Sequence, residues 1–128
     1  MEIIFQQNMD HQTNISELKE KVKMFCEERD WDQFHNAKDL AIGVSTESAE
    51  LLEHFRWKSD EQIKQMFNDP KKREAIEEEV SDVFYFLLRF SQMYDIDMTS
   101  ALHDKMKKNE QKYPVEKAKG SNKKYSEL

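Results

Sequence analysis

The sequence predicts an all-α protein. Apolar residues recur three and four positions apart in several stretches, the spacing of one helix face, and no stretch alternates with the period of two that marks a half-buried strand. Two Gly and two Pro in 128 residues, with 36% charged residues, are typical of helices joined by few tight turns. A chain of this length is expected to form one domain with a modest core.

The first two expected helices lie in the N-terminal half. Asn14 and Glu17 resemble a capping box at the start of the first helix, which we expect to end near Arg29. The second helix is expected from about Lys38 to Trp57, with apolar residues along it at helical spacing. The aromatic and polar stretch between them shows no clear periodicity.

Two further helices are expected in the middle of the chain. Ser59 and Gln62 can cap a short third helix. Asp69 and Pro70 suit the N-cap and first residue of a fourth. This fourth helix contains the most hydrophobic run of the chain and is expected to end near Asp95.

A fifth helix is expected to open at Asp97 or Thr99 and to stop before Pro114. The Lys-rich remainder is expected to be mobile. The chain is thus expected to comprise a polar N-terminal segment, a helical domain and a Lys-rich C-terminal tail, at residues 1–14, 15–114 and 115–128.

Charge and cysteine content narrow the classes of function. A net charge of −6 argues against nucleic-acid binding, which needs a basic surface, but is compatible with a nucleotide whose phosphates arrive with a metal. Cys26 is the single cysteine, so no disulfide can form within the chain, and its place beside Phe25 predicts a buried structural thiol. Without a long apolar segment or signal peptide, we expect a soluble, cytoplasmic protein that does not enter membranes.

Two acidic pairs with the same spacing, Glu47-x-x-Glu50 and Glu79-x-x-Asp82, lie within stretches that otherwise form apolar helix faces. Residues three apart lie on nearly the same face, so each pair directs two carboxylates the same way. Four converging carboxylates in an apolar setting would repel one another unless a multivalent cation neutralised them. Oxygen ligands without a cysteine or histidine cluster favour Mg²⁺, with Mn²⁺ as a substitute.

The alternative to a metal site is a solvated surface. With 26 Asp and Glu residues in the chain, one E-x-x-E on a helix is expected by chance and most often lies on an exposed face. Two such pairs, each followed directly by an apolar stripe, favour a shared metal site.

The apolar surface of the second and fourth helices is wide, and residues 83–88 are all apolar or aromatic. A helix that is hydrophobic nearly all round must be covered on all sides. Five helices of this size can hardly do that within one chain, so we expect a homodimer or a homotetramer.

Four motifs in order carry a resemblance to a known family. The first is the set of acidic pairs at 47–50 and 79–82, about thirty residues apart. The other three motifs span residues 28–35, 50–58 and 105–114. Together they resemble the MazG-like nucleoside triphosphate pyrophosphohydrolases, and the last three resemble the small single-domain branch that includes dCTP pyrophosphatases. The resemblance covers roughly Leu18 to Lys117.

The resemblance implies a fold and an activity. Members of the family are all-α, form four-helix bundles across subunit interfaces, and hydrolyse a nucleoside triphosphate to the monophosphate and pyrophosphate. The implied metal ligands are Glu47, Glu50, Glu79 and Asp82. Glu53, one turn beyond Glu50, could support these ligands or act as the base for the attacking water, and its alternative is an exposed helix charge. No feature of the sequence decides which carboxylate takes the proton.

The resemblance also implies a nucleoside pocket. The residues that match nucleoside-contacting positions in dCTP-directed members are Trp31, Gln33, Phe34, His35 and Trp57. Aromatic rings offer stacking worth about 1–3 kcal/mol per base, and Gln33 and His35 could hydrogen-bond a polar edge. The alternative is that Trp31 and Phe34 close the end of the bundle as core residues, an interpretation that we favour for Phe34 alone.

The chain departs from the family pattern at two positions. Some dCTP-directed relatives carry a histidine in the first helix near where this chain has Val22. They also carry an aromatic residue in the fourth helix, where this chain offers Phe86 beside Tyr85. The base preference is therefore left open.

A further candidate cluster lies on the fifth helix, where Lys105, Asn109 and Lys112 share a helical face and Tyr113 follows. Two ammonium groups and an amide suit a polyphosphate, and in the family such residues approach the site. The alternative is a solvated face that balances nearby acids.

The sequence therefore predicts a Mg²⁺-dependent nucleoside triphosphate pyrophosphohydrolase of MazG-like type, acting on deoxycytidine or related pyrimidine triphosphates. The nearest enzymatic alternative is another all-α pyrophosphohydrolase, such as a dimeric dUTPase. An alternative from a different class is a non-catalytic helical module whose acidic faces bind a basic partner.

Overall fold

The structure is a computed structural model that describes residues 9–128. In this part of the chain all regular elements are helices, which confirms the all-α class. The chain forms two compact units, the first ending at Asp95 and the second comprising Ile96–Leu128.

Five α-helices and one 3₁₀ turn are described in the first unit: α2 (Met9–Gln12), α3 (Ile15–Glu28), η1 (Asp32–Phe34), α4 (Ala37–Glu53), α5 (Asp60–Asn68) and α6 (Pro70–Met93). The second unit contains α7 (Met98–Lys112), α8 (Val115–Ala118) and η2 (Tyr125–Glu127). Part of the polar N-terminal segment expected at residues 1–14 lies outside the described residues.

The expected helix starts are confirmed by their caps. The Asn14 side chain accepts from the Glu17 amide at 2.9 Å, and Asp97, rather than Thr99, caps α7 by accepting from the Ser100 amide. Ser59 and Gln62 form a complete capping box on α5, and Asp69 caps α6 ahead of Pro70. Such side-chain acceptors satisfy amide groups that have no partner within the helix.

The end of α4 differs from the expectation. The helix ends at Glu53, and the residues that follow form turns up to Trp57. Trp57 adopts φ +67, the left-handed conformation that breaks a right-handed helix. No Gly or Pro marks this end, so the helical pattern of apolar residues up to Phe55 predicted too long a helix.

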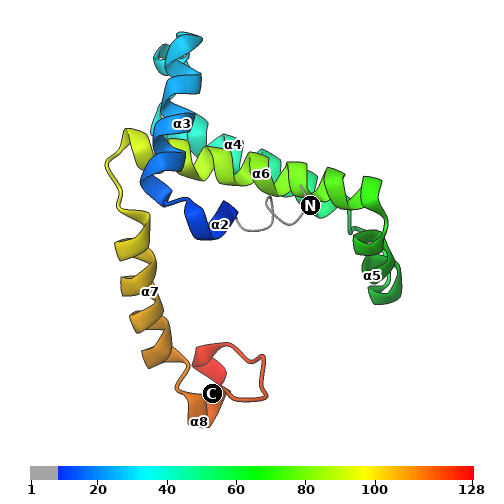
Figure 1. Cartoon of the computed structure of the whole chain (residues 1–128). Coiled ribbons are helices and arrows are strands. Elements are labelled where there is room, and N and C mark those ends of the chain that lie inside the picture. Colours follow the sequence, from blue (N-terminus) through cyan, green and yellow to red (C-terminus); the bar gives the residue numbers. More distant parts are fainter. Residues whose placement is uncertain (1–8) are drawn as a thin grey trace. The chain divides into compact units, whose positions relative to one another are not determined.

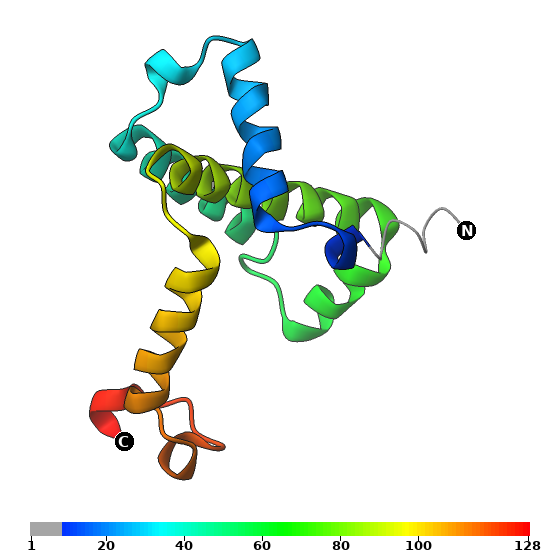
Figure 2. The ribbon, with the colours of Figure 1, turned by 60° about the vertical axis from the view of Figure 1, so that its left-hand side comes forward.

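The centre of the first unit is the antiparallel pair of α4 and α6, which run side by side in both views (Figures 1 and 2). Their direction follows from the residues that meet: Gly43 lies against Phe86, and farther along α4 Glu50 lies near Glu79, earlier on α6. A Cβ on Gly43 would lie only 2.5 Å from the Phe86 ring. The glycine therefore lets the aromatic ring reach the backbone of α4.

The core of a single chain is small. Helices α3 and α5 also pack on α6, and the buried apolar side chains are Cys26, Leu40, Met66, Ile76 and Leu88. Cys26 is fully buried, as expected for a structural thiol, with its Sγ 3.2 Å from the Tyr85 hydroxyl oxygen. Many large apolar side chains stay exposed, including Ile42, Leu52, Val80, Phe84 and Leu87 on α4 and α6.

The C-terminal residues, which the sequence predicted to be mobile, form α8 and η2. The Tyr125 ring lies edge-on to Tyr113, with 6.0 Å between ring centroids, and Lys112 Nζ lies 4.8 Å from the Tyr125 ring. These contacts attach the end of the chain to α7 within the second unit. Among the described residues, no helix is long and apolar enough to cross a bilayer.

Candidate functional site

Three glutamates converge between α4 and α6. One carboxylate oxygen each from Glu47, Glu50 and Glu79 lie within 4.8 Å of one another. Glu47 and Glu50 share a face of α4 because they are three residues apart, and the antiparallel direction of α6 brings Glu79 opposite them. Oxygen donors at this spacing can coordinate a single hard cation.

The environment of these carboxylates fits a cation. Glu47 Oε2 and Glu79 Oε2 are buried and have no hydrogen-bond partner among the described residues. Burial, followed by the interaction with Glu50 and the charges of neighbouring acids, raises the pKa of both Glu47 and Glu79 above the usual range. A buried acceptor without a partner is costly, and a divalent ion would satisfy both oxygens.

Two further side chains border the three glutamates. Asp82 is exposed and lies outside the closest group, but its charge contributes to the raised pKa values of Glu47 and Glu79. His54 Nε2 lies 3.9 Å from Glu79 Oε1. Sequence reasoning missed His54, although it follows Glu47 by seven residues and Glu50 by four, and therefore continues their helical stripe.

Glu53 has different surroundings. It is exposed at the last position of α4, and its Oε1 pairs with Arg56 at 3.2 Å. It does not belong to the group formed by Glu47, Glu50 and Glu79. The geometry resembles the exposed helix charge considered above, and a catalytic role for Glu53 stays a prediction.

The segment between α3 and α4 is anchored by a buried cation. Arg89 on α6 is only 1% exposed and donates to three acceptors: Asp32, His35 and Gln92. Its Nε lies 3.0 Å from His35 Nδ1, and one terminal nitrogen pairs with the Asp32 carboxylate. These bonds join η1 and His35 to α6 and satisfy a charge that would otherwise be very costly to bury.

Sequence reasoning also missed Arg89. The available signal was its position as the one charged residue inside an apolar run of α6, seven residues after Asp82. A charged residue in such a run is expected to be paired, but its partner Asp32 lies 57 residues away in the sequence and no local pattern identifies it.

The predicted nucleoside-contacting residues fall into two groups. Trp31 lies edge-on to Phe25 and to His35, with centroids 5.6 Å and 6.4 Å apart, and Gln33 donates to Asp30. Phe34 is 63% exposed, so the interpretation of Phe34 as a core residue is wrong for a single chain. It is the last residue of the short 3₁₀ turn η1.

Trp57 forms the second group of predicted nucleoside-contacting residues by itself. It is 87% exposed and has a left-handed backbone, an uncommon conformation for a bulky side chain. The Arg56 guanidinium carbon lies 4.8 Å from its ring centroid. Packing within the chain does not explain such an exposed and strained aromatic residue, which is the kind of outlier found at binding sites.

Phe86 lies on the same face of α6 as the acids and the buried arginine. Glu79, Asp82, Phe86 and Arg89 recur at spacings of three and four, so they form one stripe. Ten residues of helix span about 15 Å. The stripe therefore runs from the carboxylates, past an aromatic ring half-buried against Gly43, to the anchored segment that carries Trp31 and His35.

The remaining predicted residues belong to the second unit. Lys105 and Lys112 are exposed on α7, and Asn109 accepts the Tyr113 amide through its backbone oxygen at 2.8 Å. Lys112 and Tyr113 both contact Tyr125. Lys105, Asn109 and Lys112 thus lie on one helix, as expected, and Tyr113 directly follows it.

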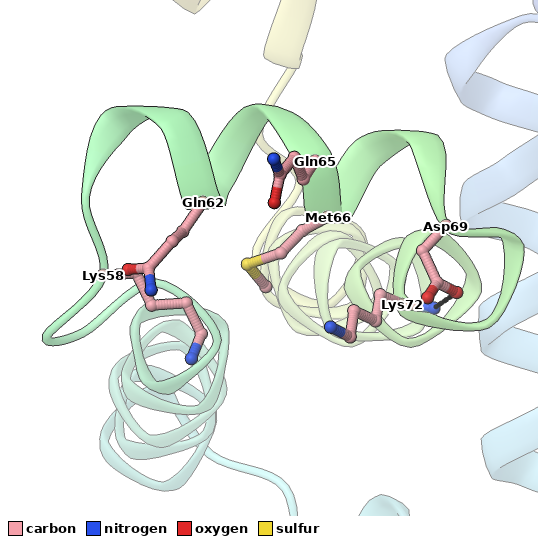
Figure 3. Close-up of a pocket in the computed structure, with 6 residues that line it drawn as sticks. All are labelled: Lys58, Gln62, Gln65, Met66, Asp69 and Lys72. Atoms are coloured by element: carbon pink, nitrogen blue, oxygen red, sulfur yellow. Dashed lines mark hydrogen bonds between the residues drawn. The ribbon is translucent and has the colours of Figure 1, made fainter.

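A cavity lies away from the acidic group. Its volume is about 370 Å³, and its walls are Lys58, Gln62, Gln65, Met66, Asp69 and Lys72. Figure 3 shows polar ends of Lys58, Gln65 and Lys72 arranged around the Met66 thioether. None of the three converging glutamates and none of the predicted nucleoside-contacting residues lines this cavity.

The structure thus places three converging glutamates, which could hold a cation, between two antiparallel helices of an all-α protein. The sequence profile of the MazG-like family matches residues 42–128. The chain belongs to the MazG-like family.

Several known proteins are similar to this chain. It is 40% identical to dCTP pyrophosphatase 1 of Rattus norvegicus over 104 residues, which cover 81% of this chain and 61% of that protein. It is 38% identical to dCTP pyrophosphatase 1 of Homo sapiens with the same coverage. The chain thus spans about three fifths of the length of these relatives.

A solved structure is also similar. The crystal structure of a pyrophosphatase from Archaeoglobus fulgidus DSM 4304 superposes with a TM-score of 0.72 at 36% sequence identity. The match covers 77% of this chain and 91% of the archaeal chain.

Proposed function

We propose that this protein hydrolyses a deoxynucleoside triphosphate, dCTP or a related pyrimidine nucleotide, to the monophosphate and pyrophosphate in a Mg²⁺-dependent reaction. The observation that carries this proposal is the convergence of Glu47, Glu50 and Glu79 with two buried oxygens that have no partner. Family membership and the names of the similar proteins, dCTP pyrophosphatase 1 and a pyrophosphatase, support the same activity.

Glu47, Glu50 and Glu79 would hold the cation, with Asp82 completing the set from the next turn of α6. A divalent ion held there would neutralise charge on the triphosphate and would lower the pKa of the attacking water. Mg²⁺ is favoured because all the ligands are hard oxygens, and Mn²⁺ accepts the same set.

The reaction that suits these residues is attack of water at the α-phosphorus. The new bond joins the water oxygen to phosphorus, the bond to the bridging oxygen breaks, and pyrophosphate leaves. A carboxylate near the acidic group takes the proton, and the candidates are Glu53 and the glutamates themselves. Catalysis of this kind depends mainly on positioning and on electrostatic stabilisation.

The nucleoside would bind towards the other end of the α6 stripe. There Trp31 and Phe34 offer exposed aromatic rings, and Phe86 offers a half-buried one. Trp57 follows the end of α4 on the side of the acidic group, so its exposed ring would contribute from that end. Gln33 and His35 carry groups that can recognise a base edge. On α7, Lys105, Asn109, Lys112 and Tyr113 suit triphosphate oxygens through two ammonium groups, an amide and a hydroxyl.

A homodimer or homotetramer is part of the proposal. Val80, Phe84 and Leu87 on α6 stay substantially exposed in a single chain. Contiguous apolar surface of this kind marks a protein interface. Pairing with a second copy would cover these side chains and complete a bundle around the acidic centre.

A nucleotide panel tests the activity. Purified protein with Mg²⁺ is incubated with dCTP, dUTP, dTTP, CTP and UTP, and the products are separated by chromatography. We expect a deoxynucleoside monophosphate and pyrophosphate, with dCTP turned over fastest. Preference for dUTP would support the dUTPase alternative, and the absence of both turnover and metal binding would support a non-catalytic interaction module.

A further inference from the structure

The hydrogen bonds of Arg89 decide which nitrogen of His35 carries a proton. A guanidinium group offers only donors, and Arg89 Nε–H points at His35 Nδ1 over 3.0 Å. Nδ1 must therefore be the unprotonated acceptor, and the ring proton of the neutral imidazole lies on Nε2. His35 is held as a donor at Nε2.

This donor is left for an external group. The described residues make no hydrogen bond to His35 Nε2, while the ring itself is half-buried and lies edge-on to Trp31. The opposite side of the imidazole is fully occupied by Arg89. A neutral N–H beside an aromatic ring suits the edge of a planar base, which can accept a hydrogen bond while its face stacks.

We propose that Arg89 is a positioning residue for base recognition, which holds His35 with its proton on Nε2 so that His35 donates to an acceptor on the base. This inference rests on the proposed function. The acceptor is N3 of cytosine, an unprotonated ring nitrogen. Uracil carries N–H at position 3, so a fixed donor facing that position favours cytosine over uracil.

The geometry of Arg89 suits this role better than that of a lysine. Its planar fork makes three bonds in fixed directions, to Asp32, to His35 and to Gln92. Because Asp32 is the first residue of the 3₁₀ turn and His35 directly follows it, the same fork holds both ends of the turn. Arg89 therefore sets the orientation of His35 as well as its protonation.

Two substitutions of His35 separate recognition from support of the fold. An asparagine can place its oxygen near the position of Nδ1, so His35→Asn keeps an acceptor for Arg89 but has no donor where Nε2 was. A glutamine reaches farther and can place its NH₂ near the position of Nε2, so His35→Gln restores the donor. Thermal melts of both variants check that the fold is retained.

We expect His35→Asn to keep its melting temperature while its cytosine-over-uracil selectivity, measured as the ratio of kcat/KM for dCTP and dUTP, falls about tenfold, the effect of one hydrogen bond. His35→Gln should recover part of this ratio. Unchanged selectivity in a folded His35→Asn variant would overturn the inference, while turnover itself would still support the proposed function.

The tautomer is read directly by ¹⁵N NMR of labelled protein, in which the His35 signals are those that His35→Asn removes. We expect an unprotonated Nδ1 and a protonated Nε2 at neutral pH, and a mixture of tautomers in Arg89→Lys. A proton on Nδ1 in the unsubstituted protein would overturn the inference. This measurement needs no substrate, so it stays decisive if the protein hydrolyses no nucleotide.

Discussion

Glu47 and Glu79 each bury a carboxylate oxygen that nothing in the described part of the chain satisfies. Their raised pKa values have burial as the main cause, with like charges adding to it. Both effects destabilise the folded protein at neutral pH when no cation is bound. The acidic centre is therefore a site where function and stability oppose each other.

Removing the charge of any one of the four proposed metal ligands is expected to abolish activity and to stabilise the metal-free protein. Glu50→Gln or Asp82→Asn should lower turnover more than about a hundredfold, because even loss of a group behind a metal ligand costs roughly 10–100-fold. In EDTA, either variant should melt at or above the temperature of the parent protein, and Mg²⁺ should raise the melting temperature of the parent alone.

The matched control is Glu78→Gln, which removes an exposed charge next to Glu79 without changing the acidic group. It should leave both turnover and the Mg²⁺-induced shift as they are. Near-parental activity in Glu50→Gln or Asp82→Asn would show that the metal site is assigned to the wrong residues.

Glu53 poses a separate question, since it is exposed and paired with Arg56. If it accepts the proton of the attacking water, Glu53→Gln should reduce kcat about a hundredfold, the usual contribution of a general base, and leave Mg²⁺ affinity unchanged. Glu61→Gln on α5 is the control for loss of an exposed acid. Equal kcat in the two variants would assign the proton to a member of the acidic group.

His35 gives the protein a pH-dependent stability. Burial, then the charge of Arg89, lowers its pKa below the usual value, against the opposing charges of Asp32 and Asp39. A histidine with a lowered pKa contributes stability that is present above its unfolded pKa and is lost as the pH falls through its folded pKa. Protonation would place a second donor opposite Arg89 Nε and break their hydrogen bond.

Acidification from about pH 8 to about pH 5 should therefore lower the melting temperature of the unsubstituted protein more than that of His35→Asn, because it spans the ordinary histidine pKa of about 6.5. Carboxylates titrate in both proteins, so their contribution largely cancels in the difference between the two curves. Parallel curves would show that His35 is equally protonated in the folded and unfolded states.

The helices show which features the sequence could predict. Asn14, Ser59, Asp69 and Asp97 are N-caps whose partners lie two or three residues away, so local patterns predicted all four. The acidic pairs were predicted for the same reason, since each lies within one turn of a helix. The sequence placed them on two helices but contained no measure of the distance between them.

Features that depend on distant residues could not be predicted. Arg89 bonds to Asp32 and His35 across more than fifty positions, and α4 ends at Glu53 without a Gly or Pro to mark its end. Likewise, Gly43 gave no sign that it faces an aromatic ring. Each depends on how helices pack, which propensities and periodicities do not encode.

The close contact between α4 and α6 at Gly43 allows us to predict the effect of a substitution on the packing of these helices. In Gly43→Ala the new methyl would lie 2.5 Å from the Phe86 ring. Overpacking of this kind costs about 1–3 kcal/mol, which exceeds the roughly 1 kcal/mol that alanine contributes to helix stability. We expect a lower free energy of unfolding, measured by urea denaturation.

A double variant identifies the cause. Gly43→Ala combined with Phe86→Leu should be less destabilised than the sum of the two single variants, because the smaller side chain makes room for the methyl. Additive losses would mean that the glycine acts through backbone entropy and not through contact with the ring.

At the scale of the whole molecule, one chain leaves Ile42, Leu52, Val80, Phe84 and Leu87 largely uncovered on its two central helices. In the described part of the chain, 9–128, only a few apolar side chains are buried, so a second copy would add substantially to the core. If two copies pair through α4 and α6, the acidic centre lies near their interface. The residues of α7 that we propose to bind the triphosphate, among them Lys105 and Lys112, would then come from the neighbouring subunit.

Mixing two inactive variants tests this sharing. Asp82→Asn lacks a metal ligand and Lys112→Ala lacks a phosphate-binding ammonium group, so each alone should have little activity. After unfolding and joint refolding, half of the randomly assorted dimers contain one copy of each variant. If the sites are shared between subunits, each of these mixed dimers has one intact site of two, so roughly a quarter of the activity should return.

The oligomeric state is measured by light scattering, which should show a dimer or a tetramer without nucleotide. Separately refolded samples, mixed afterwards without exchange, provide the control. A fully active monomer would contradict the shared site and would leave the assignment of the metal ligands intact.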